Sequence, residues 1–205
     1  QYALEFDGAF PRFTDKIYFK KAYHPILLWK ERKERQGRAV PVDLKLSPPA
    51  KVLIISGPNA GGKTMALKTM GILVLMLQTG IPVPTEEASL PIFNKIFSDI
   101  GDDKALEYQM STFSAHLKRL QEILNAIQDH TLILIDEIGR GTNPSEGSAL
   151  AMSFLDTFKA KKAWTIVTTH YEGLKAYALQ KKDALNVAVG IESKTLRPTY
   201  QLLYN

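Results

Sequence analysis

Val52–Thr64 reads V-L-I-I-S-G-P-N-A-G-G-K-T, and this stretch decides the fold of the chain. The apolar run Val52–Ile55 is β-branched and leucine-rich, so it suits a strand buried on both faces. The residues after Ser56 fit the pattern G-x-x-x-x-G-K-[ST], and a helical pattern begins at Thr64. A strand, a glycine-rich turn and a helix N-terminus in this order are typical of a cradle for phosphate groups.

We call Gly57–Thr64 the phosphate loop. Its glycines allow backbone N–H groups to converge on phosphate oxygens, and the helix N-terminus adds a partial positive charge. Lys63 is expected to reach the β- and γ-phosphates of ATP, and Thr64 is expected to bind Mg²⁺. A fortuitous glycine-rich loop is the alternative, which the flanking strand and helix disfavour. The residues predicted to hold the nucleotide are Gly57, Pro58, Asn59, Ala60, Gly61, Gly62, Lys63 and Thr64.

Composition indicates an ordinary globular protein. The 205 residues are 45% apolar and 23% charged, with no cysteine, so disulfides and cysteine–zinc sites are excluded. The lack of cysteine is compatible with a reducing cytosol, and we predict a cytoplasmic protein. No signal peptide is visible, and the longest apolar helical run, Ile72–Leu77, is too short to span a bilayer, so no membrane partner is expected.

The net charge of +5 gathers early in the chain, because residues 1–50 hold ten basic and six acidic side chains, which gives +4. The densest run is Lys30–Arg38, K-E-R-K-E-R-Q-G-R. It can be read as a contact with nucleic acid. The interleaved glutamates favour a solvated loop or helix end instead.

Residues 1–50 are predicted to form an irregular antiparallel β layer, and residues 51–205 the nucleotide-binding core. In the β layer, Tyr2–Phe6, Lys16–Phe19 and Pro25–Trp29 read as short extended segments, and Val40–Leu46 alternates like an edge strand. Val40 or Val42 is a candidate for contact with an adenine ring, whereas Tyr23-His24-Pro25 reads as a packed turn. The chain stops just after a strand-like run, so we expect it to be an excised part of a longer protein.

In the core, a helix is predicted from Thr64 to Gly80, where glycine and the following prolines end it. Ile92–Phe97 reads as a strand. The acidic segment Asp99–Asp103 can orient water or Mg²⁺, but a solvated turn is favoured. A helix follows Ser111-Thr112-Phe113-Ser114, with a serine as its cap. Further predicted elements are a helix over Ser145–Phe158 and a closing hairpin of Leu185–Ile191 and Thr199–Tyr204.

Thr131–Ile135 is a second buried-strand pattern, and it ends in Asp136-Glu137. This is a Walker B pattern, in which an apolar strand delivers an aspartate towards the metal. Successive strand residues point in opposite directions, so the two carboxylates need not share a role. We predict that Asp136 binds Mg²⁺ with Thr64 and that Glu137 orients or deprotonates the attacking water.

A third strand, Trp164–Thr168, ends in Thr168-Thr169-His170. His170 follows a core strand downstream of Walker B, and we predict that it senses the γ-phosphate. The catalytic residues predicted from the sequence are therefore Glu137, His170 and Lys63. The other histidines, at positions 24, 116 and 130, have no such context and read as structural.

Together, the phosphate loop, Asp136-Glu137 and His170 resemble the ABC class of P-loop ATPases, although the transporter word L-S-G-G-Q is missing. The words G-P-N-A-G-G-K-T, S-T-F-S, D-E-I-G-R-G-T and T-T-H-Y resemble the MutS family of DNA-handling ATPases. The run N-P-S-E-G from Asn143 and the late R-P-T-Y-Q-L resemble its second bacterial branch, MutS type two. Arg140 departs from that branch, which often has alanine there.

The resemblance implies a homodimer with composite ATP sites, in which Ser111 of one subunit approaches the γ-phosphate bound to the other. A serine-capped helix N-terminus suits an anion, which agrees with this role. The resemblance also implies that the full-length type-two protein carries a coiled-coil clamp and a nuclease-type Smr domain. It further implies roles in suppressing recombination by binding branched DNA and in rescuing collided ribosomes.

We therefore predict an α/β domain in which a mostly parallel sheet is flanked by helices and preceded by an antiparallel β layer. Its predicted function is Mg²⁺-dependent ATP binding and hydrolysis with nucleotide-driven dimerisation, and DNA is bound mainly through other regions. The alternatives are the ATPase domain of a mismatch-repair MutS and a nucleotide-gated dimerisation module with little turnover. Direct nucleic-acid binding through Lys30–Arg38 lacks a base-stacking aromatic cluster.

Overall fold

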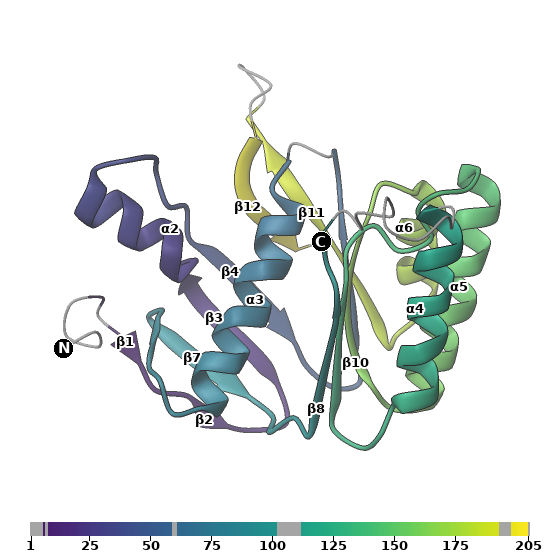
Figure 1. Cartoon of the computed structure of the whole chain (residues 1–205), viewed down its shortest axis with the longest axis horizontal. Coiled ribbons are helices and arrows are strands. Elements are labelled where there is room, and N and C mark those ends of the chain that lie inside the picture. Colours follow the sequence, from purple (N-terminus) through teal and green to yellow (C-terminus); the bar gives the residue numbers. More distant parts are fainter. Residues whose placement is uncertain (1–5, 7, 59–60, 102–111, 193–197, 205) are drawn as a thin grey trace. The chain divides into compact units, whose positions relative to one another are not determined.

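The computed structural model describes residues 6, 8–58, 61–101, 112–192 and 198–204. Contacts divide the chain into two compact units. The first unit contains Gln1–Pro48, Gly57–Ile92 and Val187–Asn205, and the second contains Pro49–Ser56 and Phe93–Asn186. Figure 1 shows both units and labels many of their helices and strands.

The second unit is built on parallel strands that lie in the order β5-β10-β9-β8. The strands β5 and β9 are buried at every residue, because runs such as V-L-I-I and L-I-L-I present apolar side chains to both faces. Figure 1 shows the helices α4, α5 and α6 of this unit beside one another on one face of these strands. The bounds are β5 Val52–Ser56, β8 Lys95–Asp99, α4 Thr112–Ala126, β9 Thr131–Ile135, α5 Pro144–Ala160, β10 Trp164–Thr169 and α6 Glu172–Gln180.

The core of the second unit joins these strands to the helices. Leu120 and Ile123 of α4, Leu155 and Phe158 of α5, and Leu174 of α6 are all fully buried in one apolar cluster with the strand residues. Burying each such side chain contributes about 1.5–3 kcal/mol. The apolar residues whose spacing predicted the helix α4 are thus the ones that pack into this core.

The predicted C-terminal hairpin is confirmed, since β11 (Ala184–Ile191) pairs antiparallel with β12 (Pro198–Tyr204). The full hydrogen-bonded strand order of this sheet is β12-β11-β5-β10-β9-β8. The sheet is mostly parallel and flanked by helices, as the sequence predicted.

The first unit contains the predicted N-terminal antiparallel layer. Its main sheet has the strand order β2-β7-β3-β4, and β3 runs antiparallel to both β7 and β4. As predicted, β4 is an edge strand of this sheet, and its side chains alternate between buried and exposed. The bounds are β1 Gly8–Ala9, β2 Arg12–Phe13, β3 Ile17–Ala22, β4 Val42–Leu46, β6 Val83–Pro84 and β7 Glu87–Leu90.

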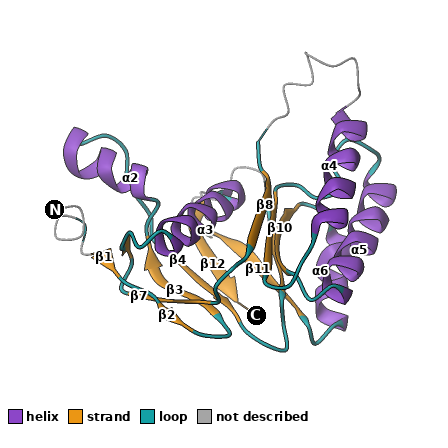
Figure 2. Cartoon of the chain, turned by 60° about the horizontal axis from the view of Figure 1, so that its bottom comes forward, coloured by secondary structure: helices purple, strands orange, loops and turns teal. Residues whose placement is uncertain are grey.

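Helix α3 (Lys63–Gln78) of the first unit begins directly at the phosphate loop (Figure 2). Its apolar side chains at positions 67, 70, 73, 74 and 77 are buried. The helix ends at Gln78, Thr79 caps it, and Gly80 follows with φ +80°. The predicted glycine stop is confirmed.

Pro25–Trp29 forms the helix α2 and not an extended segment, so that prediction was wrong. Proline at the first helical position loses no hydrogen bond and has the helical φ already, so Pro25 starts this helix rather than preventing it. Leu28 then becomes buried against Phe6 and Ala39.

The basic run continues from α2 as a π-helical turn, η1 (Lys30–Glu34), with no buried side chain. Glu31 Oε2 accepts a hydrogen bond from Ala39 N at 3.1 Å, and the Arg32 guanidinium lies 5.6 Å from the centre of the Phe6 ring. The run is therefore an exposed helix end that makes these two contacts with its own unit.

Within the described residues, every helix is too short or too polar to cross a membrane.

Candidate functional site

The phosphate loop belongs to the first unit and lies at the N-terminus of α3. Gly62, in a left-handed conformation with φ +91°, precedes the first helical residue, Lys63. The Lys63 side chain is only 1% exposed, and its Nζ donates to Gly57 O at 2.8 Å. Thr64 follows in the first helical turn and is partly buried. A buried ammonium group beside a helix N-terminus favours an anion.

A cavity of about 250 Å³ lies in the first unit, lined by Gly62 of the phosphate loop, α3 and β4. Both candidates for adenine contact, Val40 and Val42, line it, together with Ala66 and Met65 of α3. Tyr200 of β12 also lines it and packs against Gly62, where an added Cβ would lie 2.7 Å from the Tyr200 ring. We call this cavity the base pocket.

His24 also lines the base pocket. Burial, and secondarily the charge of Lys68, lower the pKa of His24, so the ring is neutral near pH 7. Among the described residues, its buried Nδ1 has no hydrogen-bond partner. The turn read as simple packing from the sequence therefore contributes His24 to the cavity wall, while the Nδ1 atom of this side chain is itself buried.

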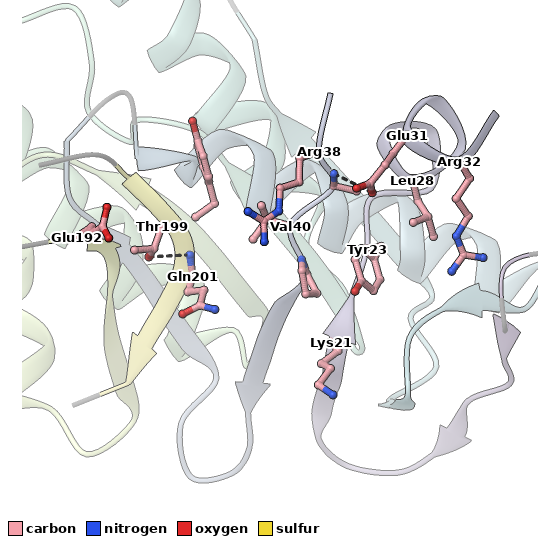
Figure 3. A pocket seen from close by; sticks show the side chains of 13 residues that line it. Lys21, Tyr23, Leu28, Glu31, Arg32, Arg38, Val40, Glu192, Thr199 and Gln201 are labelled. Carbon is pink, nitrogen blue, oxygen red and sulfur yellow. Dashed lines mark hydrogen bonds between the residues drawn. The ribbon is translucent and has the colours of Figure 1, made fainter. Parts of the chain in front are cut away.

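A wider groove of about 1110 Å³ adjoins the base pocket and shares Arg38, Val40 and Tyr200 with it. Figure 3 shows its wall: Lys21 and Tyr23 at the end of β3, Glu31 and Arg32 of η1, and Thr199 and Gln201 of β12. Two hydrogen bonds stiffen this wall, one from Ala39 N to Glu31 and one from Gln201 N to Thr199 Oγ1 at 3.4 Å. The base pocket thus lies beside a groove whose wall carries several charged side chains.

The predicted catalytic carboxylates belong to the second unit, where neighbouring strands end level with one another. In the register of the sheet, Val167 of β10 pairs with Ile135 of β9. Asp136 is 7% exposed, and its Oδ1 accepts a hydrogen bond from Thr168 Oγ1 at 2.6 Å. Thr168 Oγ1 in turn accepts from Glu137 N at 2.8 Å. One buried hydroxyl therefore fixes both Asp136 and Glu137.

Glu137 has a left-handed backbone, with φ +52°. This conformation is rare for a side chain of this size and persists only where the surroundings impose it. Here it is held by the bond to Thr168, by Ile138 N donating to Thr168 O at 3.2 Å, and by Arg140 N donating to Glu137 O at 3.0 Å. Such strain is typical of functional positions.

His170 follows β10 and is exposed. Its ring lies 4.5 Å from the ring of Tyr171, centre to centre, and Tyr171 OH donates to Gly139 O at 3.0 Å. Burial, and secondarily the Glu137 carboxylate, raise the pKa of the Tyr171 hydroxyl, so it remains a donor. The second unit thus places Asp136, Glu137 and His170 at the carboxyl ends of two neighbouring strands, β9 and β10.

Residues 53–204 match the family model described as MutS domain V. The chain belongs to the MutS family. Domain V is the ATPase domain of this family, so the predicted family and its ATPase fold are confirmed.

Relatives of this MutS domain include Endonuclease MutS2 of Shouchella clausii, 44% identical over 205 residues, which are 98% of this chain and 25% of the relative. Endonuclease MutS2 of Aquifex aeolicus is 44% identical over 200 residues, which are 97% of this chain and 26% of the relative. That of Finegoldia magna is 44% identical over 205 residues, 98% of this chain and 25% of the relative. These relatives support the type-two branch, and the chain spans about a quarter of their length.

Sequence reasoning about the MutS domain missed the roles of three residues of the second unit, Thr168, His116 and Asp99. Thr168 was read only as part of T-T-H, although its place at the end of a buried strand was a usable signal. His116 was read as structural without context, and Asp99 as part of a solvated turn. Both are buried and lie 2.6 Å apart. Of the predicted site residues, Asn59, Ala60 and Ser111 lie outside the described residues, as do Asp102 and Asp103.

Thr168→Val should lower the free energy of unfolding of the MutS domain by about 1–3 kcal/mol, because Asp136 and Glu137 N lose their buried partner. Thr165→Val on the same strand is the matched control. Thr165 is equally buried, and within the described residues its Oγ1 has no hydrogen-bond partner, so its loss should change stability by less than about 1 kcal/mol. Urea unfolding checks both, and equal effects would contradict the bridging role.

Proposed function

We propose that this MutS domain binds Mg²⁺–ATP and hydrolyses it. The observation that carries the proposal is the strained Glu137, whose backbone is bonded to the same threonine hydroxyl that bonds Asp136. A buried carboxylate fixed in place beside a second carboxylate suits a metal ligand with an adjacent base. Release of inorganic phosphate from ATP by the chain tests the proposal.

The phosphates would be held by the backbone N–H groups of Gly57–Gly62 and by Lys63. Thr64 and Asp136 would supply the hard oxygen donors that Mg²⁺ prefers. No group of three histidine, aspartate or glutamate side chains gathers among the described residues, so the protein offers only part of a coordination shell there. This fits an ion that is held by one or two protein oxygens together with phosphate oxygens and water. When bound, Mg²⁺ would neutralise charge that develops on the phosphates.

The protein's own contribution to hydrolysis would be positioning and charge stabilisation. Glu137 would orient the attacking water or accept its proton. His170, exposed after the end of the neighbouring strand β10, would contact the γ-phosphate. Lys63 would balance the charge of the β- and γ-phosphates. No covalent intermediate with the protein is needed for this reaction.

The base pocket suits the adenine ring. It lies beside the phosphate loop, and its walls combine the apolar Val40 and Ala66 with the ring of Tyr200. Mostly apolar walls beside a phosphate loop are typical of a ligand pocket.

Tyr200→Ala should weaken ATP binding about tenfold, because stacking of a base on an aromatic ring contributes about 1–3 kcal/mol. Binding of inorganic triphosphate should stay within about twofold, since the phosphate loop is unchanged. Leu203→Ala is the control, because Leu203 lies on the same strand, is 50% exposed and does not line the pocket. Isothermal titration with both ligands checks this. Equal losses for ATP and triphosphate would place the defect in the phosphate loop instead.

We further propose that ATP is shared between two copies of this domain, with Ser111 of the partner subunit at the γ-phosphate. Support comes from the match to MutS domain V and from the S-T-F-S word at the start of α4. The relatives are named endonucleases. We propose that nuclease activity, DNA binding and any ribosome contact of the full-length protein reside mainly outside this chain. We also propose that the full-length protein is cytoplasmic.

A further inference from the structure

His116 of α4 is fully buried, and both of its ring nitrogens are hydrogen-bonded. Nδ1 lies 2.6 Å from Asp99 Oδ2, and Gly139 N donates to Nε2 at 3.1 Å. Because a main-chain N–H can only donate, Nε2 carries no proton. The ring proton therefore lies on Nδ1 and is donated to the Asp99 carboxylate. His116 is a neutral acceptor whose tautomer is set by Asp99.

Gly139 is held at both ends of its backbone. Its N–H donates to His116, and its carbonyl oxygen accepts from Tyr171 OH at 3.0 Å. Its φ of +83° favours glycine, and an added Cβ would collide with Gly147 O at the start of α5. We call the two hydrogen bonds that Gly139 makes with His116 and Tyr171 the Gly139 clamp.

The clamp is joined to the Walker B strand through Asp99. Asp136 N donates to Asp99 O at 2.8 Å, and Arg140 Nη2 lies 3.9 Å from Asp99 Oδ1. The main chain of Asp99 therefore holds the residue before Glu137, while its side chain orients the histidine that holds Gly139. Glu137 lies between these two fixed points.

The same loop also rests on the first turn of α4. At Gly141, an added Cβ would lie 2.9 Å from the Cα of Phe113. The loop after Glu137 thus touches α4 twice, through His116 and at Phe113. A shift of α4 would be transmitted to the turn that carries Glu137.

We propose that His116 is a positioning residue for ATP hydrolysis, a role that rests on the proposed function. Its acceptor nitrogen fixes Gly139 and so maintains the left-handed Glu137 from which the carboxylate acts. His116 is fully buried and uses both ring nitrogens within the protein, so it would act through the turn and not on the reacting atoms. Loss of the acceptor should lower kcat and leave the KM for ATP nearly unchanged, because the phosphate loop and base pocket are not altered.

Two amide substitutions separate the two hydrogen bonds. The amide nitrogen of His116→Asn replaces Nδ1–H towards Asp99 but supplies no acceptor for Gly139. The oxygen of His116→Gln reaches the place of Nε2 and restores that acceptor while losing the donor to Asp99. His130→Asn is the control, because His130 is exposed and has φ +57°, which asparagine tolerates.

The measurements are ATP turnover, thermal unfolding and the amide hydrogen exchange rate of Gly139 in the 205-residue chain. His116→Asn should lower kcat about tenfold or more with KM within about twofold, whereas His116→Gln should keep kcat within about threefold. Exchange at Gly139 should be accelerated by His116→Asn and not by His116→Gln. His130→Asn should match the wild type in every measurement.

Equal loss of kcat in the asparagine and glutamine variants would overturn the proposal, since it would indicate packing of the ring rather than the acceptor. Unchanged Gly139 exchange in His116→Asn would also overturn it, whether or not the chain turns ATP over. A wild-type chain that binds ATP without turnover would instead contradict the proposed function. The two failures are therefore distinguishable.

Discussion

Lys63→Ala should weaken binding of a fluorescent ATP analogue by about 100-fold or more, with little change in the unfolding temperature. The Lys63 ammonium is buried at the N-terminus of α3, within hydrogen-bond distance of Gly57 O. Against ATP it would serve the β- and γ-phosphates together, and charge-assisted hydrogen bonds contribute about 1.5–3 kcal/mol each. The fold should persist because an alanine is a good helix former at this position and removes a charge that is costly to bury.

The matched control for this prediction is Lys68→Ala. Lys68 lies on the same helix, is exposed, and changes the net charge by the same amount. If Lys68→Ala weakened nucleotide binding as much as Lys63→Ala, the effect would be general electrostatics rather than the phosphate loop. Unchanged affinity in Lys63→Ala would contradict the assignment of this loop. Fluorescence titration and thermal melting of both variants decide between these outcomes.

The features that could be predicted from the sequence are those encoded by neighbouring residues. An apolar run followed by polar residues predicts a buried strand and the site residues after it. This pattern marks the strand Val52–Ser56 with its loop and the strand Thr131–Ile135 with its carboxylates. The stop of α3 at Gly80 and the closing hairpin are likewise local. These patterns were sufficient for the fold class and for the family.

The features that could not be predicted depend on contacts between distant residues. His116 meets Asp99 across 17 positions and Gly139 across 23, and no local pattern indicates that these three residues lie together. A default reading therefore placed Asp99 in a solvated turn, although it is 7% exposed. Tyr200 reaches the phosphate loop only because β12 returns beside β11, so its part in the base pocket required the fold.

The prediction of an extended segment at Pro25–Trp29 failed for a different reason. Proline was read as an interruption of helices, whereas at the first helical position its fixed φ and missing N–H favour a helix start. The choice between these readings is settled by burial of Leu28 in a cluster with Phe6 and Ala39. The free energy gained by burying Leu28 cannot be read from local propensity alone.

Glu137→Gln should separate ATP binding from hydrolysis and reveal the dimer. The substitution nearly preserves volume and removes the carboxylate that would orient or deprotonate water, so turnover should fall about 100-fold or more. Asp136 keeps its hydrogen bond from Thr168, and Lys63 and Thr64 are untouched, so the affinity for Mg²⁺–ATP should change little. Glu172→Gln, an exposed carboxylate at the start of α6, is the control and should turn ATP over normally.

If two subunits share each ATP, the nucleotide binds the dimer better than the monomer and stabilises it by mass action. The wild type would hydrolyse its ATP and dissociate, whereas Glu137→Gln should remain paired. Adding Ser111→Arg should abolish the pairing, because a bulky cation would occupy the approach to the γ-phosphate. Light scattering after size exclusion with Mg²⁺–ATP measures the mass of wild type, single and double variants.

A Glu137→Gln chain that binds ATP and stays monomeric at high concentration would defeat the composite site for this chain. A dimer that persists with Ser111→Arg would place the interface away from the γ-phosphate. A wild type that stays dimeric while turning over ATP only slowly would indicate a nucleotide-gated module, in which ATP serves mainly to hold the subunits together.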